Sequence, residues 1–444
     1  MSITPLHDQV PRQIAALAMV LVLAMIADSG SAAPPAPAAD AADTPRPYMR
    51  VSGPDARTRE LQIAIRRLQP REKEGPTIWL TAVVHIGSKR YYQSLQDHLD
   101  AQDLVLYEGV GSPAFLDPRP GSDRVRADRT RTALDFIALM ATWYHQQHGS
   151  FPVSLSILSQ AADAGRPRHS WWLKRALRDG WSHPIDYKRK PDGFVLTSFG
   201  ADGRPGGQDL AADIVFDEPP PTEAARKLSE PILQSSLAEA LGLVFQLDVI
   251  DYDRRHFINS DMPLGRIRLF MREQPGGQSN GDPDLDQLIR LMDGSSMLAS
   301  VLKGGFRVLG SSPQLRAMMK LFMVEMLGEI KGDMAQMRGM PPAFRRLMRI
   351  LIEDRNRIVL RDLKQHLQRP DPPQSISVFY GAGHMADLEK RIVRELDYRP
   401  AGDRWYSAFG ADVRQAGLTE GDLKLVRALI RAQMRQLQGG PVAP

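Results

Sequence analysis

A strand, a helix and a second strand follow one another between residues 77 and 108, and this pattern constrains the fold more than any other feature of the chain. The segment TIWLTAVVH is apolar and suited to a strand, SKRYYQSLQDHLDAQ has helical spacing, and DLVLYEGV is typical of a buried strand. A connection this short, through one helix, joins parallel strands by a right-handed crossover. We therefore predict an α/β fold with a mixed or mostly parallel central sheet flanked by helices.

Three polar side chains stand at the carboxyl ends of predicted strands. His85 ends the first strand, Glu108 ends the second strand 23 residues later, and His384 closes a late strand in the run SISVFYGAGH. In open α/β sheets the carboxyl ends of the strands form the edge where ligands bind. If the late strand joins the same sheet, two imidazoles and one carboxylate meet at that edge.

Two histidines and a carboxylate are a suitable ligand set for zinc, manganese or cobalt with one position open for water. Metal-bound water is a nucleophile near neutral pH, and Glu108 suits the role of ligand or of general base. The spacing does not decide between these two roles. The alternative is that each histidine only caps a strand or satisfies a nearby backbone group.

Four segments resemble the successive motifs of the TraB/PrgY/Tiki family: TAVVHIGSKRYYQSL, DLVLYEGVG, IEDRNRIVLRDL and SVFYGAGHMADLEKRI, with QLDVIDYDRRHFINSDM between them. The resemblance implies an α/β fold related to the erythromycin esterases and the haem-binding ChaN proteins. It also implies metal-dependent proteolysis, the activity of the Tiki members. By this resemblance His85, Glu108 and His384 take the catalytic or metal-binding positions, and Arg355 and Arg357 match the basic motif of the family.

The basic motif also has a purely structural explanation. Glu353, Asp354, Arg357 and Arg361 are spaced so that they can form ion pairs three and four residues apart along a helix. Both explanations stay open from the sequence alone.

The first family motif departs from its pattern at one position, because Ala82 stands where the family has glycine. Alanine is tolerated there if the glycine serves only a close approach of the backbone. If the glycine supplies a positive φ, the site is distorted in this chain.

Residues 131–217 resemble the C-terminal domain of the type II secretion major pseudopilin, protein G. The resemblance rests on an apolar helix, on a D-x-W-x-x-P-x-x-Y block that begins at Asp179, and on an S-x-G-A-D-G-x-x-G-G loop that begins at Ser198. We predict that this small α+β module is inserted into the TraB/Tiki-like domain, whose two parts are residues 76–130 and 218–444.

The loop of the module carries acidic residues among glycines. Asp202 and Asp209 lie seven residues apart across three glycines, and Asp213 follows. Such a backbone can wrap and point its carbonyls inward while the carboxylates supply charge, which suits calcium, although the spacing is not that of an EF-hand. We predict Asp202, Asp209 and Asp213 as calcium ligands. The alternative is a solvated turn of Gly and Asp.

The N-terminus has the layout of a secretory signal, with Arg12, an apolar run over residues 14–27 and small residues after it. We predict a signal peptide over residues 1–33 and a Pro/Ala-rich linker and lead-in over residues 34–75. An uncleaved membrane anchor is the alternative, and either form exports the bulk of the chain to the periplasm or beyond. The chain has no cysteine, which excludes disulfides, thiolate nucleophiles and Cys-ligated zinc.

These features together predict an exported, metal-dependent hydrolase of the peptidase type with His85, Glu108, His384 and Arg355 at its site and a peptide or protein as substrate. The module is expected to bind calcium and a partner in the secretion apparatus or envelope. Lys and Arg number 57 against 52 Asp and Glu and are interleaved with them, so no nucleic-acid partner is expected. The alternative is a non-catalytic envelope protein that binds a peptide or small ligand and docks through the module.

Overall fold

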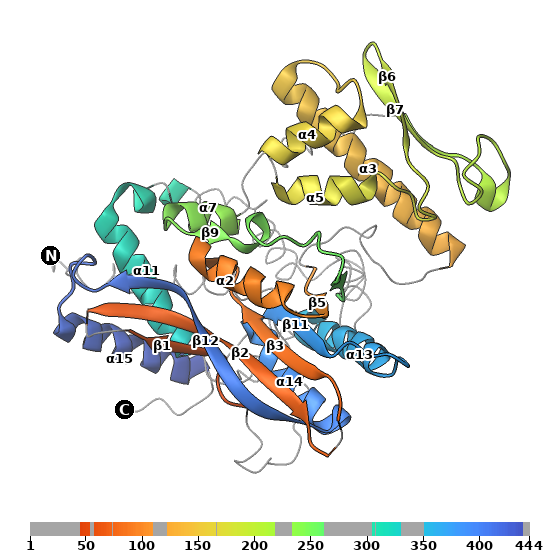
Figure 1. The fold of residues 1–444 in the computed structure, drawn as a ribbon. Coiled ribbons are helices and arrows are strands. Elements are labelled where there is room, and N and C mark those ends of the chain that lie inside the picture. Colours follow the sequence, from red (N-terminus) through yellow and green to blue (C-terminus); the bar gives the residue numbers. More distant parts are fainter. Residues whose placement is uncertain are drawn as a thin grey trace. The chain divides into compact units, whose positions relative to one another are not determined.

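The computed structural model describes residues 45–53, 57–72, 74–109, 122–165, 167–217, 233–261, 304–306, 308–329 and 350–437. The chain forms two compact units, shown in Figure 1. The first unit comprises Met1–Glu108, Ile232–Met262 and Ile267–Pro444, and the second comprises Gly109–Pro231 and Pro263–Arg266. The predicted signal peptide and the Pro/Ala-rich part of the predicted linker, up to residue 44, lie outside the described residues.

A seven-stranded mixed sheet forms the centre of the first unit. Its strands are β1 (Met49–Ser52), β2 (Thr58–Pro70), β3 (Thr77–Val83), β5 (Leu104–Tyr107), β10 (Phe257–Asn259), β11 (Ser375–Gly381) and β12 (Tyr398–Asp412). Their order is β1-β2-β3-β11-β5-β10, and β12 lies beside β2 along its whole length (Figure 1). Strands β3, β11, β5 and β10 are parallel, whereas β1 and β12 pair with β2 in antiparallel fashion. The predicted α/β fold with a mixed sheet flanked by helices is confirmed.

The two strands of the predicted strand–helix–strand segment are parallel but are not neighbours. Strand β11 lies between them, with Ser377 opposite Trp79 of β3 on one side and Val105 of β5 on the other. All four residues of β5 are buried, and so are the last six of β11. Strands covered on both faces are apolar throughout, which explains why these two are readable in the sequence.

Two strands, β1 and β2, lie upstream of residue 76, where the sequence predicts only a linker and lead-in. Strand β2 contains Arg66, whose side chain is fully buried. Its guanidinium donates to Asp403 of β12 at 2.8 Å and to Glu389 at 2.6 Å, and Glu389 belongs to helix α14 (Met385–Leu396). A buried arginine needs such partners, and because they lie more than 300 residues away, the pattern of β2 alone resembles an exposed segment.

The helices of the first unit are α2 (Lys89–Asp100), α7 (Leu233–Ala240), α11 (Pro313–Gly328), α13 (Arg355–Leu367), α14 and α15 (Glu420–Leu437). Helix α2 begins where the hydroxyl of Ser88 accepts a hydrogen bond from the backbone N–H of Tyr91, as an N-cap residue does. Its buried residues Tyr91, Leu95 and Leu99 recur every fourth position. Within the described part of the chain, every helix is too short or too polar to cross a membrane.

The second unit combines three helices with a small antiparallel sheet. The helices are α3 (Asp123–His148), α4 (Leu155–Gly165) and α5 (Pro167–Ala176), and the strands, in the order β6-β7-β8, are Asp186–Lys190, Gly193–Ser198 and Ile214–Phe216. Its core is apolar and includes Ile137 and Ala141 of α3, Leu158 of α4, Leu173 of α5 and Leu196 of β7, all fully buried. This unit therefore has a hydrophobic core of its own.

One buried histidine makes the stability of the first unit depend on pH. His98 of α2 lies with its Nε2 3.3 Å from the hydroxyl of Thr81 and its ring edge-to-face with Trp79. Burial, with a smaller contribution from the charge of Arg404, lowers the pKa of His98 from 6.5 to about 4. The folded protein therefore keeps this imidazole neutral where an unfolded chain would protonate it.

The variant His98→Gln is expected to lose less stability in acid than the wild type. Between the unfolded pKa of 6.5 and the folded pKa of about 4, the unfolded chain binds one more proton, so the free energy of unfolding falls as the pH falls through this window. Urea unfolding followed by circular dichroism at pH 7 and pH 4.5 measures the difference. Equal losses in the two proteins would show that His98 does not titrate as described.

Candidate functional site

The predicted site residues meet at one edge of the sheet of the first unit. Because β11 pairs in parallel with both β3 and β5, the carboxyl ends of the three strands lie together. His85 follows β3, Glu108 follows β5, and His384 ends the short helical turn that follows β11. All three side chains are buried, with exposed fractions of 4%, 3% and 0% respectively.

Ala82, the position at which the sequence departs from the predicted motif, lies inside β3 opposite Tyr380 of β11. The described non-glycine residues with positive φ are Ser182, Asp209 and Asp397, so Ala82 has ordinary strand backbone. Alanine adopts that backbone without strain. The substitution therefore leaves the backbone of the site undistorted.

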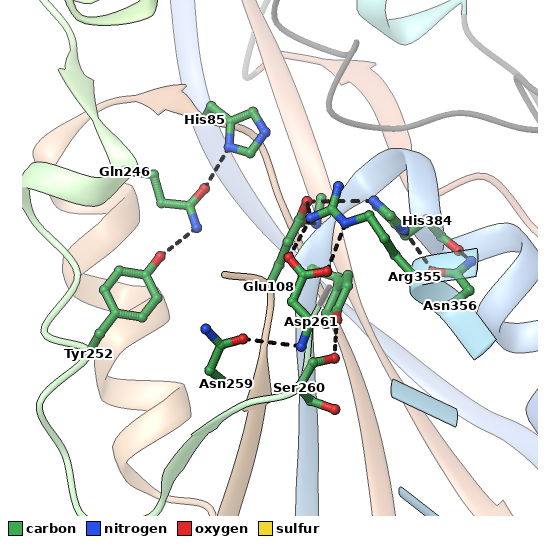
Figure 2. Close-up of polar contacts among 12 residues, drawn as sticks. His85, Glu108, Gln246, Tyr252, Asn259, Ser260, Asp261, Arg355, Asn356 and His384 are labelled. Atoms are coloured by element: carbon green, nitrogen blue, oxygen red, sulfur yellow. Dashed lines mark hydrogen bonds and ion pairs between the residues drawn. The ribbon is translucent and has the colours of Figure 1, made fainter. Parts of the chain in front are cut away.

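Glu108 is the centre of the hydrogen bonds at this edge (Figure 2). Its Oε1 accepts from Nη2 of Arg355 at 2.6 Å, and its Oε2 accepts from the backbone N–H of Gly381 at 2.6 Å. The Nε2 of His384 lies 3.6 Å from Oε1. Both carboxylate oxygens are therefore engaged by the chain itself.

The charge state of Glu108 follows from two opposing effects. Burial raises the pKa of its carboxyl group, but the positive charge of Arg355, followed by the interactions with His384, outweighs burial and holds the pKa well below its usual range. Glu108 is therefore an anion at neutral pH. A carboxylate with so low a proton affinity is a weak general base, and the geometry favours an electrostatic role.

Each imidazole is oriented by a side-chain amide. Nδ1 of His384 lies 2.7 Å from Oδ1 of Asn356, and Nδ1 of His85 lies 3.0 Å from Oε1 of Gln246. Gln246 in turn donates to the hydroxyl of Tyr252 at 2.7 Å (Figure 2). An amide oxygen only accepts, so Nδ1 of each ring carries the proton, and the neutral ring has its lone pair on Nε2.

Arg355 lies between two buried carboxylates. Besides Glu108, it binds Asp261 with two hydrogen bonds, from Nε at 2.8 Å and from Nη2 at 2.7 Å. Its side chain is 2% exposed. Arg357, the other arginine of the predicted basic motif, is 58% exposed and forms ion pairs with Asp354 and Glu353. The motif therefore divides into a site residue and an exposed helix residue.

Three further residues of the candidate site were not predicted from the sequence: Gln246, Asn356 and Asp261. Asn356 follows Arg355 directly, and Gln246 and Asp261 lie in the segment QLDVIDYDRRHFINSDM, which resembles a family segment. That resemblance was the signal in the sequence from which these residues could have been found. Contacts with β5 decide which polar residues of this segment turn inward. The backbone N–H of Ser260, for example, donates to the carbonyl oxygen of Tyr107.

The predicted transition-metal site was His85, Glu108 and His384. Among the described residues, no three His, Cys, Asp or Glu side chains lie together so that they could hold a metal ion. Glu108 in particular directs its oxygens to Arg355 and Gly381. The arrangement does not fit a three-ligand centre. Zinc, manganese or cobalt at this site stays a prediction.

The predicted calcium loop of the second unit folds back on itself. Glycines 200, 203, 206 and 207 all have positive φ, from 62° to 93°, which glycine adopts at no steric cost. Asp213 accepts from the backbone N–H of Gly206 at 3.0 Å, and Asp202 accepts from that of Arg204 at 3.0 Å. The structure shows Asp209 with a positive φ of 53° at the start of a helical turn. The calcium site stays a prediction.

Asp179, the first residue of the D-x-W-x-x-P-x-x-Y block, forms hydrogen bonds that hold the residues next to this loop. Its Oδ1 accepts from the backbone N–H groups of Trp181 and His183, both at 2.9 Å, and its Oδ2 accepts from the hydroxyl of Ser198 at 2.6 Å. Nδ1 of His183 lies 3.0 Å from the carbonyl oxygen of Gly200. The block and the loop are thus parts of one hydrogen-bonded structure.

Comparison with known proteins shows what the second unit is similar to. Residues 120–217 match the family "Type II secretion system (T2SS), protein G". The type II secretion system core protein G of Xanthomonas campestris pv. campestris is 29% identical over 99 residues, which cover 22% of this chain and 69% of that protein. No solved structure matches the chain. The predicted pseudopilin-like resemblance is confirmed, with a start at residue 120. The resemblance of the flanking segments to the TraB/PrgY/Tiki family stays a prediction.

Two neighbouring arginines of α13 are expected to differ strongly in their effect on stability. Arg355→Met leaves Glu108 and Asp261 buried without their shared cation, which should cost about 3–5 kcal/mol. Arg357→Met removes only exposed ion pairs and should cost less than about 1 kcal/mol. Urea unfolding of both variants at pH 7 measures the difference. Similar losses would mean that the buried ion pair does not stabilise the fold.

Proposed function

We propose that the first unit is a hydrolase that cleaves an amide or ester bond at the edge formed by β3, β5 and β11. The observation that carries this proposal is the convergence of two buried imidazoles and a buried carboxylate, with Nδ1 of each imidazole fixed by an amide oxygen. This arrangement presets the tautomer in which Nε2 can exchange a proton.

In the proposed reaction, Nε2 of His85 removes a proton from a water molecule as its oxygen attacks the carbonyl carbon of the substrate. The negative charge of Glu108 stabilises the imidazolium that forms, since the two groups interact electrostatically. The imidazolium of His85 then returns this proton from Nε2 to the leaving nitrogen or oxygen as the carbon–heteroatom bond breaks, which restores the neutral ring. The lone pair on Nε2 of His384 accepts a hydrogen bond from the attacking water and orients it. Arg355 keeps Glu108 ionised and in place.

The substrate class follows from the chemistry and from the resemblance. A site with two proton-transferring imidazoles suits direct attack by water on a peptide or a related ester. The Tiki-like resemblance favours a peptide or protein as substrate. A transition metal would require a third ligand in place of Glu108, whose two oxygens are already hydrogen-bonded, so the proposed reaction uses the protein groups alone.

The second unit is proposed to bind a partner in the secretion apparatus or envelope. The match of residues 120–217 to type II secretion protein G supports this role by analogy. The same similarity supports the proposal that the chain is exported, in agreement with the signal-like N-terminal sequence. We further propose that the loop binds calcium through Asp202, Asp209 and Asp213.

Replacing either imidazole is expected to abolish hydrolysis. His85→Gln and His384→Gln should each lower kcat/KM about 100-fold or more, since general acid–base groups contribute about 10²–10⁴. The assay follows release of amines from a mixture of unstructured peptides and of p-nitrophenol from its acetate ester. His98→Gln, a buried histidine of the same unit outside the site, serves as the matched control.

Three outcomes decide this proposal. Turnover that the wild type and the His98→Gln control share and the site variants lack supports it. Wild-type protein without turnover, bound to peptide, would favour a non-catalytic envelope protein. Stoichiometric zinc, manganese or cobalt in the purified wild type, lost in both site variants, would restore the metal-dependent form of the reaction.

Calcium is expected to raise the melting temperature of the second unit. A ligand that binds only the folded state stabilises it by about 2.7 kcal/mol at 100 times its Kd. Asp202→Asn and Asp209→Asn should reduce the shift, whereas Asp192→Asn, an exposed acid in the turn between β6 and β7, should keep it. A melting temperature that responds to neither calcium nor chelator would refute the site.

A further inference from the structure

A cavity of about 550 Å³ lies in the first unit and shares no lining residue with the site around Glu108. Its walls come from β1, β2, β12, α11 and α15 and from the segment before β1. The volume lies within the range of small-molecule sites in proteins, about 300–1,000 Å³. Nothing in the proposed hydrolysis uses this space.

The cavity has an excess of positive charge. Eight charged side chains line it, five of them arginines and three of them carboxylates: Arg46, Arg50, Arg59, Arg427 and Arg431, and Glu325, Glu329 and Asp403. One of the carboxylates, Asp403, is shared with Arg66, the buried arginine of β2. The arginines of the lining therefore outnumber its carboxylates by two, and the lining has a net positive charge.

The carboxylates on the helical wall are already shared among the arginines. Glu325 of α11 accepts two hydrogen bonds from Arg427 of α15, at 2.7 and 2.6 Å. Arg59 has its Nε 3.6 Å from the same carboxylate, and within the described part of the chain that buried Nε has no hydrogen-bond partner. Glu325 is therefore divided between Arg427 and Arg59, and Arg59 is incompletely neutralised.

Arg50 of β1 also lines the cavity, and it has no carboxylate partner among the described residues. Its guanidinium lies over the ring of Trp405, 4.0 Å from the centroid, and its Nε donates to the amide oxygen of Gln62 at 2.9 Å. Stacking on an aromatic ring holds a guanidinium flat while its outer N–H groups stay available to an anion. The cation is thus preorganised and not neutralised.

Apolar surface lies next to these charges. Met49 and Val51 of β1 line the cavity together with the ring of Trp405. Helix α11 approaches β1 so closely at Gly328 that a Cβ there would lie 2.2 Å from Cγ2 of Val51. This wall is therefore closed by tight packing, and a flat apolar body can rest against it.

We propose that this cavity binds a small organic dianion, in which an oxyanion headgroup pairs with Arg50 and Arg59 and a flat apolar body lies against Trp405. Two negative charges match the excess of the lining. A phosphate monoester and an aromatic dicarboxylate share this chemistry. The proposal is independent of the proposed hydrolysis.

Isothermal titration calorimetry tests the proposal. The full chain is titrated at constant ionic strength with four probes: phenyl phosphate, phthalate, inorganic phosphate and neutral phenol. We expect one molecule of phenyl phosphate or phthalate to bind per chain, at least about tenfold more tightly than inorganic phosphate or phenol, because only the first two supply both charge and ring. The tighter of the two identifies the headgroup as phosphate or dicarboxylate. Absence of one-to-one binding by both would overturn the proposal.

Variants of the cavity and one matched control complete the test. Arg50→Gln should weaken binding about tenfold, the usual effect of losing one charge-assisted contact. Trp405→Leu should weaken it by a similar factor, because it removes the aromatic surface and the ring that holds the guanidinium of Arg50. Arg399→Gln removes the same charge from an exposed position of β12 outside the cavity and should bind as the wild type does. Arg50→Lys keeps the charge and the fold and should give an intermediate affinity. Equal weakening in Arg399→Gln, or none in Arg50→Gln, would show that the anion does not bind in the cavity.

Discussion

The carboxylate of Glu108 determines how the candidate site of the first unit is built. One oxygen accepts from Arg355 at the start of α13, and the other accepts from the backbone of Gly381 at the end of β11. A single anion thus fixes the distances among the end of β5, the turn that carries His384 and the helix that carries Asn356. Because Glu108 is buried, its negative charge is stable only next to Arg355, so the ion pair and the hydrogen bonds of Glu108 form together.

The positions of the site residues could be predicted because they follow strands that are buried on both faces. Such strands are continuous apolar runs, and their ends at His85, Glu108 and His384 are visible in the sequence. Their partners could not be predicted. Gln246 and Asp261 face the site only because β9 (Val244–Phe245) pairs with β4 (Ile86–Gly87) and β10 pairs with β5, and no local pattern encodes those pairings.

The same contrast applies to the fold and to the second unit. Strand β2 was missed because Arg66 and Arg67 interrupt its pattern, and their partners lie far along the chain in β12 and α14. The pseudopilin-like unit was readable because its glycines with positive φ and its Asp179 block are local requirements, met within about 20 residues of one another. Long-range ion pairs leave no such local signature, which is also why the arginine-lined cavity has no counterpart in the sequence analysis.

The pairing of Thr77 with Ser375 also determines the order in which the two units can fold. The described helices and strands of the second unit lie between Asp123 and Phe216, so the contacts among them can form once that stretch has emerged. Strand β3 must wait for β11, which emerges almost 300 residues later, and long-range pairings of this kind are slow to form. In the nascent chain, the edge of β3 that pairs with β11 stays unpaired until β11 has emerged, and an unpaired strand edge is prone to mispairing.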